Sequence, residues 1–104
     1  MSVIPDTMID DVARRFSLLG DPTRLRIVRV LHDHGESSVQ DVAAAAGITL
    51  ANASQHLVRL FDGAIVSRRR QGKSVRYQIV DPTIEALCRT VCDSLDERTR
   101  TLSV

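Results

Sequence analysis

Four polar side chains between residues 52 and 59 recur at the spacing of one helical face. Asn52, Gln55, His56 and Arg59 stand at i, i+3, i+4 and i+7, so a helix would bring them together. Carboxamide and guanidinium groups can form paired hydrogen bonds with base edges, Asn or Gln with adenine and Arg with guanine. The pattern predicts a helix that reads the major groove of DNA. The alternative is the solvated outer face of an ordinary amphipathic helix.

Positive charge is concentrated in the segment that follows. Residues 54–80 hold six basic side chains against Asp62 alone, a net charge of +5, whereas residues 1–53 and 81–104 each carry −2. A cationic hairpin here would reach phosphates or the minor groove beside the helix, although cations on an edge strand also prevent aggregation. Thr49 and Ser54 suit phosphate contacts near the helix start. The predicted DNA contacts in the hairpin are Arg68, Arg69, Arg70, Gln71, Lys73 and Arg76.

Two cysteines near the C-terminal end form a second chemical pattern. Cys88 and Cys92 are four residues apart, which puts both sulfur atoms on one face of a helix. Two such thiolates could bind a soft metal or metalloid ion, such as As(III), Cd(II) or Cu(I), with further ligands from a second subunit. They could also respond to oxidation. Both lie in an apolar stripe, however, and buried cysteines often serve only packing, so the sensory and structural interpretations both stay open.

Periodicity and breakers indicate the elements that position these groups. A helix is predicted over about 7–19, where Val12 and Phe16 recur at helical spacing. Asp21, Ser38 and Thr49 are predicted N-caps of the three helices that follow. Alternating apolar residues predict two strands joined by a turn at Gly72. The other predicted helices lie between Asp21 and Gly35, over Val39–Ala46, from Thr49 to Gly63 and over about 82–100, and the strands are Ile65–Arg70 and Ser74–Val80.

Apolar stripes predict which faces of these helices are buried. The second helix should bury Leu25, Val28 and Leu31, and the fourth Ala53, Leu57 and Leu60. The last helix should bury Ile84, Leu87, Cys88, Val91 and Leu95. The stripes at the two ends of the chain exceed what one small core needs, which favours a dimer.

Length and composition are those of one folded domain. The chain has 104 residues, 43% of them hydrophobic and 26% charged, as is usual in globular proteins. We expect a single domain over 1–104 with flexible ends at 1–6 and 101–104, no membrane segment, no signal sequence and a cytoplasmic location. No nucleophile–base pair, glycine-rich phosphate loop or supported carboxylate pair is evident, so we do not expect an enzyme.

Four runs of residues stand in a specific order and spacing. They are Leu19–Ile27 (LGDPTRLRI), Ala43 with Gly47 and Ile48, Ser54–Leu57 with Leu60, and Arg70–Tyr77 (RQGKSVRY). In this arrangement nearly the whole chain resembles the ArsR/SmtB family of bacterial winged helix-turn-helix repressors. The resemblance implies a mainly α fold with a β-hairpin wing, in the order α-α-α-α-β-β-α. It also implies a homodimer formed by the first and last helices, a roughly palindromic double-stranded operator, and an inducer that lowers DNA affinity.

The chain departs from the family pattern in two places. Gly63 and Ala64 stand where the family usually has the small residue first and glycine second, which predicts a fourth helix that ends one residue earlier. The family's metal ligands are also replaced: Ser38 and Gln40 take the place of a Cys-x-Cys pair, and Asp81, Thr83, Ser94 and Glu97 that of Asp, His, His and an acid. Zinc prefers nitrogen and sulfur ligands, so neither family metal site is intact.

Two other interpretations remain at this point. One is a winged-helix regulator that is constitutive, or controlled by a protein or small molecule, with purely structural cysteines. The other is a protein-interaction module that uses the fold without DNA, which the +5 segment disfavours.

Overall fold

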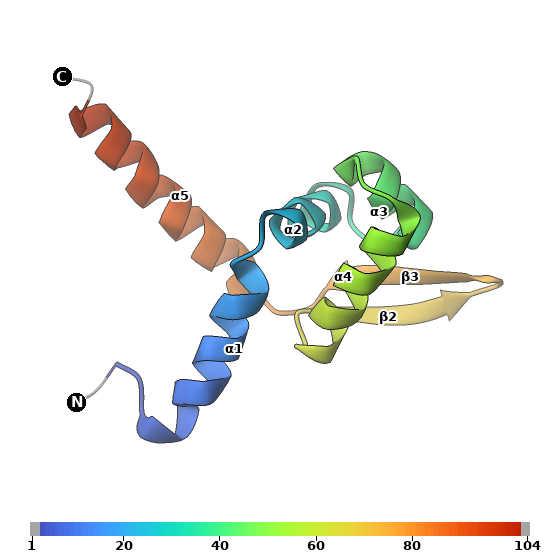
Figure 1. Ribbon diagram of the computed structural model, residues 1–104, viewed down its shortest axis with the longest axis horizontal. Coiled ribbons are helices and arrows are strands. Elements are labelled where there is room, and N and C mark those ends of the chain that lie inside the picture. The colour runs from blue at the N-terminus through green and yellow to red at the C-terminus, as the bar shows by residue number, and fades with distance from the viewer. Residues whose placement is uncertain (1–2, 103–104) are drawn as a thin grey trace.

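The computed structural model describes residues 3–102. Its elements are η1 (Asp6–Met8), α1 (Ile9–Leu19), α2 (Pro22–His34), β1 (Ser37–Ser38), α3 (Val39–Ala46), α4 (Leu50–Asp62), β2 (Val66–Gln71), β3 (Ser74–Ile79) and α5 (Thr83–Leu102). In Figure 1, α2, α3 and α4 form a body beside the hairpin, whereas α1 and α5 extend away from that body and diverge from each other. None of the described helices combines the length and apolar character of a membrane span. Of the ends expected to be flexible, residues 1–2 and 103–104 lie outside the described range.

One apolar core lies where α2, α3, α4 and the hairpin meet. The inward face of α4 is confirmed, because Ala53, Leu57 and Leu60 are fully buried. Ile84, in the first turn of α5, is buried in the same core. The other core side chains include Ile27, Val28, Val30, Leu31, Val42, Ile65, Val66 and Tyr77. This core fixes α4 relative to the hairpin, so the predicted DNA-reading groups share one rigid support.

The structure corrects the expected burial of two stripes. Leu25 is 40% exposed, so α2 buries Ile27 and Val30 instead of that residue. On α5, Val91 and Leu95 are 49% and 58% exposed, and Phe16 of α1 is 55% exposed. Within one chain, α5 packs on the body only near its N-terminal end, because the helix then projects beyond it (Figure 1). The apolar stripes of α1 and α5 are real, but a single copy does not cover them.

The sheet contains one strand that the sequence did not predict. β1 pairs antiparallel with β3, so the strand order is β1-β3-β2. Its two residues, Ser37 and Ser38, carry no alternating apolar pattern, and their pairing with Tyr77 and Arg76 joins segments far apart in the chain. The predicted hairpin is confirmed, with Gly72 at a φ of 61° in its turn. β1 therefore ties the helix-turn-helix directly to the hairpin.

The predicted N-caps are confirmed at three helices. The backbone N–H of Arg24 donates to Asp21, and that of Asp41 donates to the Ser38 hydroxyl. At α4 the backbone N–H of Asn52 donates to Thr49 Oγ1 at 3.1 Å. Each cap satisfies one of the free N–H groups at a helix start. The starts of α2, α3 and α4 are thus set by local sequence.

The end of α4 carries an alanine in a conformation that favours glycine. Ala64 has a φ of 60°, in the left-handed region that a Cβ atom disfavours. Its N–H donates to Phe61 O, and that of Ile65 donates to Leu60 O, both at 3.0 Å. This is the hydrogen-bond pattern with which many helices end, with glycine at the left-handed position. The helix-turn-helix uses the same pattern at the end of α3, where Gly47 occupies that position.

Replacing Ala64 with Gly is expected to raise the free energy of unfolding by about 1 kcal/mol, because the strain of the left-handed alanine is removed. Urea unfolding at a fixed protein concentration measures the change. Gly63→Ala is the matched control and should bring no such gain, because Gly63 has an ordinary φ of −85° and an added Cβ would have to displace the tip of the Leu18 side chain. A loss of stability in Ala64→Gly would contradict the strain at this position.

Candidate nucleic-acid interface

Helix α4 presents a polar face that the protein itself leaves free. Gly47, with a φ of 69°, reverses the chain after α3, and Thr49 then starts α4. Opposite the buried face, Asn52, Gln55 and Arg59 are exposed. Within the described residues, their side chains make no hydrogen bond or ion pair with the protein. These three groups can therefore pair with groups outside the chain.

His56 does not share this freedom. It is half-buried, and its Nδ1 lies 3.3 Å from Nη1 of Arg24 on α2. A guanidinium can only donate, so a hydrogen bond here requires an unprotonated Nδ1. The predicted base contact by His56 thus competes with a contact inside the protein. The spacing that groups His56 with Gln55 could not reveal this, since Arg24 is 32 residues away.

Arg24 is a positioning residue that sequence reasoning missed. Its Nε donates to Leu18 O at 2.7 Å and its Nη2 to Ser17 O at 3.3 Å, both at the end of α1. Its backbone N–H donates to Asp21, and this hydrogen bond is the main reason why the pKa of that carboxyl is lowered. Arg24 belongs to the LGDPTRLRI run, which was the only signal available. One side chain thus joins the end of α1, the start of α2 and the middle of α4.

The basic side chains of the β2–β3 hairpin differ in the contacts that they make. Arg68 stacks on Phe61, with its guanidinium carbon 4.0 Å from the ring centroid, a cation–π contact that ties the hairpin to α4. Arg70 and Lys73 are exposed, and the described part of the chain offers neither of them a hydrogen bond or ion pair. Gln71, beside the turn of the hairpin, is also exposed. The predicted contact Ser54 is exposed on α4. The unpaired cations are thus at the tip of the hairpin.

Arg69 and Arg76 are engaged by an acid. Arg69 donates to Glu36 from Nε at 2.7 Å and from Nη2 at 2.5 Å. Arg76 lies 3.4 Å from the same carboxylate and donates to Glu36 O at 3.1 Å. The Arg69 hydrogen bonds are the main reason why the pKa of Glu36 is lowered. Besides Arg68 on Phe61, the structure therefore pairs two of the six predicted hairpin contacts with an acid of the protein itself.

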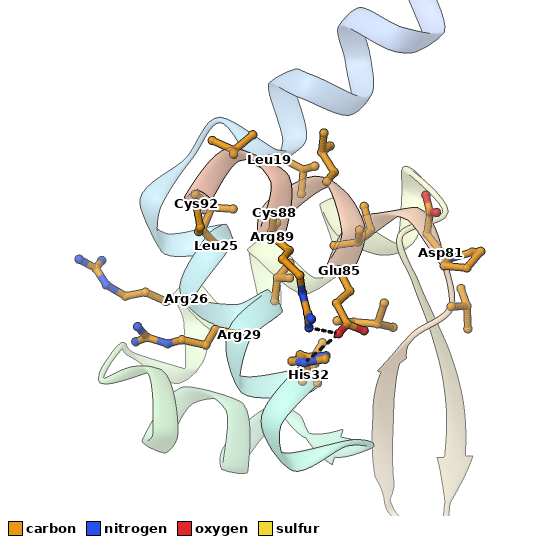
Figure 2. Close-up of a pocket in the computed structure, with 18 of the residues that line it drawn as sticks. Leu19, Leu25, Arg26, Arg29, His32, Asp81, Glu85, Cys88, Arg89 and Cys92 are labelled. Carbon is orange, nitrogen blue, oxygen red and sulfur yellow. Dashed lines mark hydrogen bonds and ion pairs between the residues drawn. The ribbon is translucent and has the colours of Figure 1, made fainter. Parts of the chain in front are cut away.

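The two cysteines differ in exposure. Cys88 is half-buried and Cys92 is exposed. Burial raises the pKa of the Cys88 thiol, and the neighbouring Cys92 adds to this shift. Cys88 is therefore a weak nucleophile without an ion to displace its proton. Both thiols line a groove of about 1130 Å³ between α2 and α5, which Figure 2 shows with Leu25, Arg26 and Arg29 on the opposite wall.

The positions of the family's metal ligands serve other purposes. Asp81 is buried and accepts hydrogen bonds from the Thr83 backbone N–H at 2.9 Å and hydroxyl at 2.6 Å. Arg15 of α1 lies 2.7 Å from the other carboxylate oxygen. Burial alone would raise the pKa of Asp81, but these partners outweigh it and lower the pKa. Across residues 3–102, no group of three or more His, Cys, Asp or Glu side chains is placed to hold a metal ion.

Comparison with known proteins places the chain among transcription regulators. Residues 19–69 match a family model for a helix-turn-helix domain. The chain is 39% identical over 84 residues to a probable mercury resistance operon repressor of Streptomyces lividans, covering 81% of this chain and 66% of that protein. It is 36% identical over 99 residues to an SmtB-homologous transcriptional repressor of Synechocystis, and the alignment covers 91% of this chain and 74% of that protein. The chain thus spans just under two thirds of the mercury regulator's length.

A solved structure shows the same fold. It is the homodimeric winged helix-turn-helix DNA-binding domain of a Mycobacterium bovis protein, with a TM-score of 0.80 and 32% identity. The alignment covers 97% of this chain and 95% of that domain. Its identity and coverage confirm the expected winged helix-turn-helix architecture over almost the whole chain.

Proposed function

Because the chain belongs to the ArsR/SmtB family of helix-turn-helix regulators, we propose that it is a homodimeric repressor that binds operator DNA. The observation that carries this function is the free polar face of α4 beside the cationic hairpin tip. Asn52, Gln55 and Arg59 supply the base-reading groups for the major groove. Arg70 and Lys73 supply phosphate contacts that fix the register, with Thr49, Ser54 and Gln71 as further polar contacts.

The proposed dimer forms through α1 and α5. Their exposed apolar side chains, Phe16, Val91 and Leu95, border one continuous groove. Burying a fully exposed side chain of this kind contributes about 1.5–3 kcal/mol. About half of each of the three is still exposed in one chain, so a second copy of these helices would gain about half of that for each side chain. A two-fold dimer would also present two α4 helices to a roughly palindromic site. The homodimeric state of the Mycobacterium bovis domain supports a dimer.

The function is tested with the DNA upstream of the protein's own gene, since such repressors usually control adjacent genes. Fluorescence anisotropy at increasing salt should give a much higher affinity for an operator fragment than for a random duplex of equal length. Equal affinity for both duplexes would reject sequence-specific binding. No affinity for either duplex at low salt would favour a protein-interaction module instead.

We further propose that a soft ion at Cys88 and Cys92 releases the repressor. Two thiols per chain are too few for a closed site, but two α5 helices at a dimer interface would bring four together. The proposal agrees with a relative named for mercury resistance. Ligation across the interface would change the angle between subunits and so the spacing of the two α4 helices, which half-sites about one helical turn apart tolerate poorly.

As(III) or Cd(II) is therefore expected to release the wild-type protein from its operator, and to leave a Cys88→Ser, Cys92→Ser variant bound. Zn(II) and a mild oxidant are tested alongside, because a redox sensor would respond to the oxidant alone. Release that persists in the double variant would place the sensor elsewhere. No release by any agent would make the cysteines structural and the repressor constitutive or controlled by another ligand.

A further inference from the structure

Glu36 lies in the short loop between α2 and β1 and faces a pair of arginines on the hairpin. Arg69 of β2 and Arg76 of β3 are directly opposite each other in the strand register. Like charges in that relation repel each other and weaken a sheet. The Glu36 side chain is only 22% exposed, and its carboxylate contacts both guanidinium groups, at 2.5 Å and 3.4 Å.

The geometry of the Glu36–Arg69 contact is that of a strong pair. Two parallel N–H groups of one guanidinium donate to the two oxygens of one carboxylate, an arrangement that fixes direction as well as distance. The backbone carbonyl of Glu36 also accepts from Arg76. Glu36 therefore joins both strands of the hairpin to the segment that leads into α3.

We propose that Glu36 is a positioning residue that holds the hairpin against the helix-turn-helix and withholds Arg69 and Arg76 from DNA. The inference rests on the proposed function, which it deepens by dividing the cations of the hairpin into two groups. Arg70 and Lys73, at the tip, bind phosphates. Arg69 and Arg76 neutralise Glu36 and set the angle at which the tip approaches the duplex.

The division has a measurable consequence in the salt dependence of binding. Each phosphate contact releases counterions, and log K therefore falls as log salt rises. Loss of one contact makes this negative slope less steep by about 0.9. A substitution in a dimer removes the contact twice, which makes the expected change about 1.8. An arginine that is held by Glu36 and releases no counterion should leave the slope unchanged.

The test measures this slope on random duplex DNA for Arg69→Ala and Arg70→Ala, each in the wild-type and Glu36→Gln backgrounds. Arg70→Ala should reduce the slope by about 1.8 in both backgrounds. Arg69→Ala should leave it unchanged in the wild type and reduce it by about 1.8 in Glu36→Gln, because the neutral amide frees Arg69 for a phosphate. Equal effects of the two substitutions in the wild-type background would overturn the proposal, as would an unchanged slope for Arg69→Ala in Glu36→Gln.

A second measurement separates this inference from the proposed function. Urea unfolding of Glu36→Gln, Arg69→Ala and the double variant forms a mutant cycle that needs no DNA. Arg69→Ala is expected to change the free energy of unfolding by different amounts in the wild-type and Glu36→Gln backgrounds. If the two changes were additive in the double variant, the pairing of Glu36 with Arg69 would be rejected. If the pairing is present and no variant or wild type binds DNA, the proposed function fails and the structural role of Glu36 stands.

Discussion

Leu95→Glu is expected to convert the dimer to a monomer and to lower operator affinity by at least about a hundredfold. Leu95 is 58% exposed in one chain and lies on the apolar stripe of α5 with Val91. In the proposed dimer this side chain is buried, and a carboxylate there would be desolvated without a partner. Loss of the dimer also separates two α4 helices whose linkage multiplies the affinity for a two-half-site operator.

Sedimentation at micromolar concentration measures the first effect. The wild type should have about twice the 11.5 kDa chain mass, and the variant should have the mass of a single chain. Ala86→Glu is the matched control, because Ala86 is exposed on the outward side of α5, and it should remain a dimer with full operator affinity. A wild-type monomer, or a dimer in both variants, would contradict the proposed interface.

Gln55→Ala is expected to cost about 1–3 kcal/mol at each half-site of the operator and almost nothing on random DNA. Gln55 is exposed on α4, so its carboxamide is available to form a paired contact with adenine. Hydrogen bonds to base edges carry sequence information, whereas phosphate contacts do not. Removing this side chain should therefore reduce specificity as well as affinity.

Paired titrations of operator and random duplex at one salt concentration measure the difference. Arg70→Ala serves as the contrasting variant, because loss of a phosphate contact should weaken both complexes alike. If Gln55→Ala weakened the two complexes equally, the assignment of α4 as the reading helix would be wrong.

Features that depend on local sequence were predictable. The caps at Asp21, Ser38 and Thr49 each act within three residues along the chain, and the buried face of α4 follows from its own periodicity. β1 was missed because only its pairing with β3 makes two serines a strand. The apolar stripe of α5 was visible in the sequence, but periodicity does not tell whether the same chain or a second copy covers it.

The residues of the candidate site could be predicted from the sequence. Which of their side chains are free and which contact another part of the protein could not. Residue type and spacing assigned His56 and Arg69 to the DNA-binding surface with the same weight as Gln55 and Arg70. The structure separates them through partners 32 and 33 residues away in the chain. Such long-range contacts leave no periodic signal, so sequence reasoning could group these side chains on one candidate surface but could not tell which of them remain free.

The three contacts of the Arg24 side chain restrict how the molecule can move. A guanidinium is planar and rigid, so the two carbonyls at the end of α1 and the ring of His56 are held to one flat group. If α1 rotates and keeps both hydrogen bonds from Arg24 to its carbonyls, the guanidinium plane must turn with it. α4 must then move too, or the contact between Arg24 and His56 is lost. The end of α1 and the middle of α4 are therefore connected through one side chain. In the proposed dimer, a displacement of α1 would therefore reach the proposed reading helix α4 through the side chain of Arg24.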